Sequence, residues 1–279
     1  MIKEIKVNFY RLVRSKSFFV VLIILMVGTL ISTAEIKICV DDPFDMLETA
    51  HEKLNEAAAS EEDAQSFDII FDSLNRYNDT NSLNGVVRMT FCSDLVCFLH
   101  CIVVSLFVAN EFKSRFHVNH FSMNSRPAFS VFMEWFSLML AIVLVETFCY
   151  ALVFLLCVIL CHSFNFADVG LMFKNGTMCI SVMIAMASLA FMIAFLRRAG
   201  ALAIVLSSIF AFGFFDFFLG IISAWFPAIE YFALNNLLSQ ISLGTLTTFG
   251  YAAGLTAILL YIAVFLGVTL IVAAKRDPY

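Results

Sequence analysis

Long apolar runs alternate with polar segments along the chain, and each run is continuous over about the 20 residues that a helix needs to cross a bilayer. The strands of a transmembrane barrel would instead alternate apolar and polar residues over roughly 10 positions. The pattern therefore predicts an all-α, polytopic membrane protein with six transmembrane helices. The predicted spans are 17–34, 91–109, 128–161, 178–196, 201–226 and 251–273.

Two further stretches are apolar without forming uninterrupted runs. In 1–16, apolar residues recur at helical spacing and basic residues take other positions, which predicts an N-terminal amphipathic helix in the membrane interface. A signal peptide is the competing interpretation, because positive charge precedes an apolar core, although its charged region would be long. In 227–250, the apolar sequence is interrupted by Pro227, Asn235-Asn236, Gly244 and Gly250. They predict short, broken helices whose backbone must be protected by protein or water.

Composition supports the membrane assignment. Hydrophobic residues make up 61% of the chain and charged residues only 14%, whereas a soluble domain carries roughly 25% charged residues. The acids behind the net charge of −5 concentrate in 35–90, which we predict to be an acidic, helical, extracellular segment. Most of the eight cysteines lie in or beside apolar runs, which indicates packing and not the disulfide framework of a secreted protein.

The distribution of basic residues predicts the orientation of the chain. Five bases precede the first span and place the N-terminus in the cytoplasm by the positive-inside rule. Six crossings then put both termini in the cytoplasm, with 35–90 outside the cell and the polar loop 110–127 inside. Twelve of the 17 Lys and Arg residues fall on the cytoplasmic side in this arrangement, and reversing it would invert the bias.

Motifs that carry enzymatic chemistry are missing from the sequence. It lacks the P-loop, the zinc-protease motif H-E-x-x-H and the nucleophile elbow G-x-S-x-G. We therefore predict a transport subunit without catalytic residues, not an enzyme. Cys97, His100 and Cys101 are spaced closely enough to share a helix face, and thiolates with imidazole suit zinc or copper. No second cluster supplies further ligands, so packing is the favoured interpretation and no metal site is predicted.

Four carboxylates fall within or at the edges of the spans: Asp94, Glu134, Glu146 and Asp216. Intramembrane carboxylates are costly and are candidate functional residues by default. Glu146 and Asp216 lie deepest, so both are candidates for a translocation path or for a proton or cation site; packing between helices is the alternative. The spans offer no Lys or Arg as a partner, so a buried carboxyl is expected to be neutral.

The loop 110–127 reads NEFKSRFHVNHFSMNSRP and carries three bases against one acid. Together with the N-terminal NFYRLVRSKSFF, it resembles the membrane subunits of type-2 ABC exporters, whose loop after the second span follows an E-F-x-x-G-T-x-x-x-x-L-x-x-P-x-S-R pattern. Glu111 and Phe112 match the opening of that pattern. Arg115 and Phe116 stand where Gly-Thr is common, and Pro127 follows the Arg instead of preceding it.

The resemblance implies that this loop holds a coupling helix, which docks into a cleft of a separate ABC ATPase subunit. ATP and Mg would be bound by that partner and no cofactor by this chain. The permease would pair with a second copy or a paralogue in the bacterial plasma membrane, and antimicrobial peptides are among the family's substrates. The segment 227–250 resembles the family's short outer-leaflet helices. The candidate ATPase contacts are Glu111, Phe112, Lys113, Arg115 and Phe116.

Two other functions stay open at this point. An ion-coupled secondary transporter would use Glu146 or Asp216; internal repeats would support it, and none is evident in the sequence. A membrane sensor would bind a ligand through the acidic segment 35–90. The bases of the loop 110–127 are, by themselves, also what a plain topology signal requires.

Overall fold

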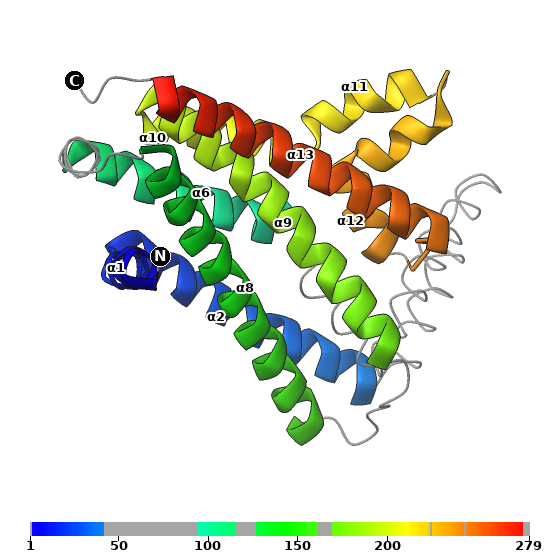
Figure 1. Ribbon diagram of the computed structural model, residues 1–279. Helices are drawn as coiled ribbons and strands as arrows, with labels where there is room; N and C mark the ends of the chain where they lie inside the picture. The colour runs from blue at the N-terminus through cyan, green and yellow to red at the C-terminus, as the bar shows by residue number, and fades with distance from the viewer. Residues whose placement is uncertain are drawn as a thin grey trace, which may run out of the picture.

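The computed structural model describes residues 2–41, 94–114, 127–160, 169–223, 225–242 and 244–275. Every element in these residues is helical (Figure 1), which confirms the predicted all-α fold. Six helical stretches are long and apolar enough to cross a membrane, as predicted. In chain order the helices are α1 (Ile2–Val13), α2 (Lys16–Asp41), α6 (Asp94–Lys113), α8 (Pro127–Leu160), α9 (Val169–Arg197), α10 (Gly200–Ala211), α11 (Phe214–Ser223), η2 (Pro227–Phe232), α12 (Leu234–Ser242) and α13 (Thr248–Lys275).

The helix α9 forms the centre of the bundle, and α6, α8, α10 and α13 pack against it (Figure 1). In the most apolar stretch of α9, 67% is buried inside the bundle, compared with 28% in that of α8. Small residues let neighbouring backbones approach closely, and such packing is a main source of helix association in lipid. The alanines of α9 with no exposed surface are Ala185, Ala187, Ala190 and Ala194.

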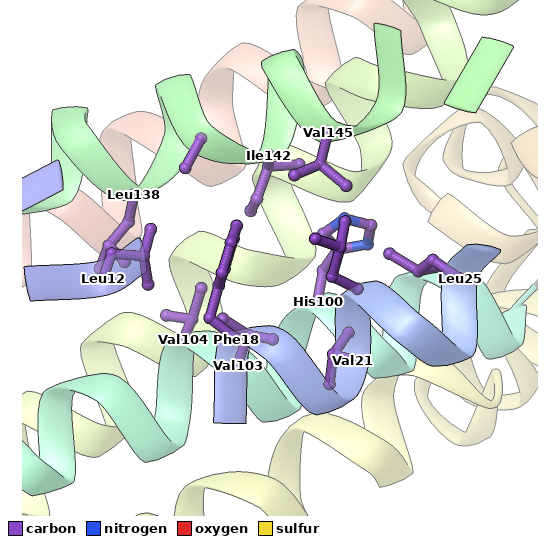
Figure 2. Close-up of a pocket in the computed structure, with 12 residues that line it drawn as sticks. Leu12, Phe18, Val21, Leu25, His100, Val103, Val104, Leu138, Ile142 and Val145 are labelled. Atoms are coloured by element: carbon purple, nitrogen blue, oxygen red, sulfur yellow. The ribbon is translucent and has the colours of Figure 1, made fainter. Parts of the chain in front are cut away.

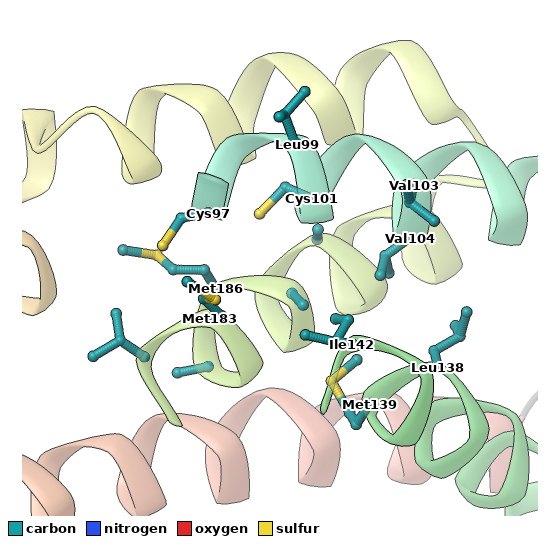
Figure 3. Close-up of a cluster of buried hydrophobic side chains, with 14 of the residues drawn as sticks. Cys97, Leu99, Cys101, Val103, Val104, Leu138, Met139, Ile142, Met183 and Met186 are labelled. Atoms are coloured by element: carbon teal, nitrogen blue, oxygen red, sulfur yellow. The ribbon is translucent and has the colours of Figure 1, made fainter. Parts of the chain in front are cut away.

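Sulfur-containing side chains fill the space where α6, α8 and α9 meet (Figure 3). Cys97 and Cys101 of α6 lie close to Met183 and Met186 of α9, and Met139 reaches in from α8. All five side chains are buried. Because Met is flexible and Cys is small, both suit irregular gaps between helices, and the two cysteines are part of this apolar packing.

Basic residues gather at one end of the bundle. Figure 1 places α1, the end of α6, the start of α8 and the end of α13 together at this end, which we call the polar end. The alternating direction of the helices brings the α9–α10 junction there as well. The basic residues at or near these helix ends are Lys6, Arg11, Arg14, Lys16, Lys113, Arg197, Arg198 and Lys275. The opposite end carries Lys174 among the described side chains.

Several predicted spans differ from the structure in their bounds. The second, predicted as 91–109, is α6 (Asp94–Lys113), so residues 110–113 of the predicted loop form its last turn. The first and the fourth are lengthened most. The helix of the first predicted span, α2, runs on to Asp41 and so enters the segment predicted as extracellular. The rest of that segment, 42–90, lies outside the described residues. The fourth begins at Val169 and not at 178. Its added polar turns are held by α13, since the Lys174 ammonium lies 4.9 Å from the Tyr251 ring centroid and the Thr177 hydroxyl 3.2 Å from the Tyr251 hydroxyl.

The predicted fifth span, 201–226, is broken into α10 and α11 at Phe212–Gly213. Gly213 has a φ of 77°, a left-handed conformation that costs glycine little. The side-chain amide of Asn235 donates a hydrogen bond to the backbone oxygen of Ala211 and so satisfies a carbonyl at the break. The stretch predicted as broken helices, 227–250, holds the short helices η2 and α12 and the start of α13.

Candidate functional site

An ion pair joins α1 to the end of α6. A guanidinium nitrogen of Arg11 lies 2.5 Å from a carboxylate oxygen of Glu111. The Glu111 side chain is only 3% exposed, whereas that of Arg11 is 25% exposed. The adjacent Leu12 is buried and fixes this side of α1 against the bundle. The last turn of α1 is therefore attached to α6 by both a charge and an apolar contact.

A second buried carboxyl group lies beside this pair. Glu134 of α8 is 5% exposed and close enough to interact electrostatically with both Glu111 and Arg11. We call Arg11, Glu111 and Glu134 the polar-end cluster. Two carboxyls that approach each other in a buried place repel when both are ionised, and a cation beside them offsets that cost. The guanidinium of Arg11, on α1, thus lies close to a carboxyl group of α6 and to one of α8.

The residue after Glu111 is also held by the bundle. The ring of Phe112 packs on Phe195 of α9 with centroids 5.5 Å apart. The guanidinium carbon of Arg198 lies 5.5 Å from the centroid of the same ring, within cation–π range. Arg198 itself has a φ of 55°, uncommon for a residue with a side chain, at the junction of α9 and α10.

The predicted ATPase contacts fall into three groups. Glu111 is buried and Phe112 half-buried, and both contact the bundle, whereas Lys113 is exposed. Arg115 and Phe116 lie outside the described residues, and the coupling role of all five stays a prediction. The sequence analysis missed the partners Arg11 and Arg198. The sequence gives little signal for them, because each is one of several bases near its helix end.

The deep carboxyl of Glu146 faces a partner that the sequence analysis did not consider. Nε2 of His100 lies 3.2 Å from Oε1 of Glu146, and the two side chains are 5% and 0% exposed. Nδ1 of His100 lies 2.8 Å from the backbone oxygen of Val96. The spans lack a Lys or Arg partner in sequence, but an imidazole on the facing helix α6 takes that place. We call His100 and Glu146 the buried pair.

A small cavity lies beside His100, between α2, α6 and α8 (Figure 2). Its volume is about 20 Å³, which is room for one water molecule. Apolar side chains such as Val21, Leu25 and Ile142 line it, and His100 is the only polar residue among the described ones that do. A buried water needs two to four polar partners, so the cavity favours a dry gap between these helices.

Asp216, the other deep candidate, caps a helix. Its Oδ2 accepts hydrogen bonds from the backbone N–H groups of Asn235, at 2.7 Å, and Asn236, at 3.3 Å. These amides belong to the first turn of α12, which has no intrahelical acceptor for them. The carboxylate of α11 therefore acts as the N-cap of α12. This contact explains why an acid lies at this depth, and its role on a translocation path stays a prediction.

Metal binding finds little support in the described part of the chain, where no three His, Cys, Asp or Glu side chains are arranged to hold an ion. Cys97 and Cys101 lie near His100 on α6, but the Nε2 of the imidazole is turned to Glu146.

Neither a protein-family model, nor a curated protein, nor a solved structure matches the chain. The described residues hold three notable arrangements of polar side chains: the polar-end cluster, the buried pair and the Asp216 cap.

Proposed function

We propose that the chain is the transmembrane permease subunit of an ATP-driven transporter of the type-2 ABC exporter class. It resides in the bacterial plasma membrane and moves its substrate outward, with antimicrobial peptides as the candidate class. A separate ATPase binds ATP and Mg, and a second permease copy or a paralogue completes the assembly. Support comes from the six helices able to span a membrane, from the Glu-Phe opening of the loop 110–127 and from the lack of a nucleotide-binding motif.

The observation that carries the proposal is the ion pair between Arg11 and Glu111. Glu111 lies in the last turn of α6, within the segment 110–127 to which the resemblance assigns ATPase docking. Through Arg11, this point is fixed to α1, and α1 packs on α8. A displacement of the loop is then transmitted to the N-terminal helix and to two spans at once, which is what a subunit driven from outside requires.

Phe112 gives the loop a second connection. Its ring is in contact with Phe195 and with the guanidinium of Arg198, and Phe195 is a buried residue of the central helix α9. Interhelical packing in a bundle responds to a push by discrete shifts, because packed cores deform little. The start of the loop is thus in contact with the helix that touches most of the others.

The placement of the bases supports the orientation that the proposal needs. Lys113, Arg197, Arg198 and Lys275 lie at the polar end together with α1. By the positive-inside rule, this end faces the cytoplasm, where a soluble ATPase is found. The loop 110–127 leaves the bundle at the same end.

Co-purification tests the proposal. The tagged chain is extracted from its native host in mild detergent, and an ABC ATPase is expected to remain bound. The Lys113→Glu variant reverses an exposed charge in the proposed contact and should reduce the ATPase yield severalfold without changing membrane insertion. Lys275→Glu is the matched control, because it reverses an exposed charge at the same end outside the loop.

Two results would overturn the assignment. If the purified chain moves substrate in vesicles without any ATPase, following an ion gradient, it is a secondary carrier. If an epitope placed in 115–126 is reached from outside intact cells, the loop cannot contact a cytoplasmic partner.

A further inference from the structure

The buried pair joins two helices that otherwise make few close backbone contacts. α6 packs mainly on α9, α10 and α2, and α8 mainly on α1, α2, α13 and α9. The contact between His100 and Glu146 lies in this loosely packed seam, with both side chains almost fully enclosed. Beside it is the dry gap lined by α2, α6 and α8 (Figure 2). The pair is therefore a polar link across a seam that has room to change.

The hydrogen bonds of the pair determine how many protons it holds. A backbone carbonyl can only accept, so Nδ1 of His100 carries the hydrogen that is donated to Val96. In a neutral imidazole, Nε2 then presents a lone pair to Oε1 of Glu146, 3.2 Å away. An ionised carboxylate would present a second lone pair, and the two would repel. One hydrogen between the two atoms turns this repulsion into a hydrogen bond.

We propose that His100 and Glu146 form a site for a single proton within the membrane, and that this proton holds α6 to α8. The proton resides either on Glu146, which donates to Nε2, or on His100, whose imidazolium pairs with the carboxylate. Both forms have zero net charge, which suits a place without water. Release of the proton leaves a neutral imidazole facing a carboxylate, with one uncompensated negative charge inside the bundle.

The surroundings of the pair make the proton the natural neutralising ligand. Among the described residues, no Lys or Arg forms an ion pair with Glu146, and both its carboxyl oxygens, like the Nε2 of His100 that faces them, are buried without a hydrogen-bond partner. The residues of α2 that line the cavity next to His100 are apolar. The other titratable groups close to the pair or to its neighbours are Asp94, Cys97 and Cys101 of α6, Cys149 of α8 and Cys179 of α9. None of these supplies a cation.

Loss of the proton has a mechanical consequence. The carboxylate and the lone pair of Nε2 repel each other. An ionised Glu146 is more stable in water than inside the bundle, so its side chain tends to move toward water. The cavity beside His100 gives the side chains of α6 and α8 space in which to part. This step needs no nucleotide and no particular energy source, so the inference holds whether or not the chain works with an ATPase.

Two spectroscopic signals test the site in the full chain reconstituted in lipid nanodiscs. The infrared bands of Glu146 report its state, as a C=O band when it carries the proton and as carboxylate bands when His100 carries it. They are assigned by their loss in Glu146→Gln and their shift on ¹³C-glutamate labelling. The ¹⁵N resonances of His100 report which ring nitrogens carry hydrogen, assigned by their loss in His100→Gln. We expect Nδ1 to be protonated and both signals to change together at one pH, because the proton belongs to both groups.

The variants separate this proton site from simple packing. Glu146→Gln retains a donor for Nε2, so His100 should keep its Nδ1–H form with no titration over the range in which the wild type changes. His100→Gln removes the base, so the Glu146 band should titrate at a different pH from the wild type. Glu134→Gln makes the same substitution elsewhere on α8 and should leave the joint change of the pair untouched.

The proposal is overturned if the His100 and Glu146 signals change at separate pH values, or if His100 carries its hydrogen on Nε2 with Nδ1 bare. It is equally overturned if His100 titrates identically in Glu146→Gln and wild type. The signals of His100 and Glu146 do not depend on whether an ATPase co-purifies with the chain. The proton site and the proposed function can therefore be disproved separately.

Discussion

Two buried glutamates of this protein each face a base, and the two bases differ in kind. Glu111 faces Arg11, whose guanidinium keeps its charge at every pH that a protein meets. Glu146 faces His100, whose imidazole can exist in a neutral or a protonated form, unlike a guanidinium. The first contact is at the polar end with Arg11 partly open to its surroundings; the second is enclosed between α6 and α8. The first is thus permanent, and the second depends on a proton.

The difference matches the depth of each site. A permanent charge is tolerable where part of the side chain reaches headgroups or water, and long Arg side chains do so readily near helix ends. Deep in the bundle, a pair that can become neutral avoids the cost of enclosing two full charges. The same acidic residue therefore serves as a fixed attachment in one place and as a reversible one in the other.

Removing the permanent charge should have the largest effect. Arg11→Gln removes the guanidinium that pairs with the buried Glu111, and breaking a buried pair costs roughly 3–5 kcal/mol. Because a quarter of Arg11 is exposed, we expect about 3 kcal/mol, measured as a lower unfolding temperature of the detergent-solubilised protein. Arg14→Gln, an exposed neighbour over the Tyr10 ring, should change it little. Equal loss in both variants would mean that the ion pair contributes nothing of its own.

Breaking the contact of the buried pair should have a smaller effect. Glu146→Ala leaves Nε2 of His100 buried without a partner, for a cost of about 1–2 kcal/mol. Glu146→Gln offers an amide donor in the same place, so its loss of stability should be at most about half that of Glu146→Ala. Thermal unfolding of both variants in detergent measures the difference. A Gln variant as unstable as the Ala variant would show that hydrogen bonding to His100 is not what stabilises the seam.

A third carboxylate, Asp216, extends the comparison to an acid that bonds backbone amides and, in the described part of the chain, pairs with no base. Asp216→Ala removes the N-cap of α12 and should cost about 1 kcal/mol, whereas Asp216→Asn keeps an acceptor oxygen and should cost less. Transport by the Asn variant separates the two interpretations of this residue. If Asp216 is only a cap, the Asn variant should transport normally. Loss of transport in that variant would favour a role for Asp216 on the translocation path.

The smallest expected effect concerns the gap beside the buried pair. Ala141→Val adds methyl groups to a residue that lines the cavity and is 3% exposed. Filling a gap of this kind typically adds about 0.5–1 kcal/mol of stability, visible as a modest rise in unfolding temperature. If α6 and α8 use this gap to move apart, the same variant should also slow the change of the His100 resonances after a change of pH. Lower stability would mean that the site is already full.

The sequence predicts the helical fold well because lipid imposes strong rules on composition. Continuous apolar runs define six spans, and the interruptions near Pro227 and Gly244 indicate short helices. It could not give the start of α9 at Val169, because the polar residues Lys174 and Thr177 resemble a loop until their contacts with Tyr251 are known. The break at Gly213 was equally hidden, since one glycine in an apolar run is common in membrane helices.

The candidate site was only half accessible from the sequence. The acids Glu111, Glu146 and Asp216 stand out, because carboxylates are rare among apolar residues. Their partners do not, because Arg11 is one of many bases in α1, His100 lies 46 positions before Glu146, and the amides capped by Asp216 belong to the backbone. Which base faces which acid is a property of how the helices pack, and a single sequence does not encode it in any local pattern.

The cap on α12 bears on the order in which the chain is made and inserted. Asp216 leaves the ribosome before Asn235 and Asn236, so the acceptor for the first turn of α12 already exists when those amides are synthesised. Hydrocarbon offers no substitute for such an acceptor. The nine-residue α12 can therefore settle against α11 during translation, before α13 has emerged. The contact of Phe232 with Tyr261, which needs the last span, can only form afterwards.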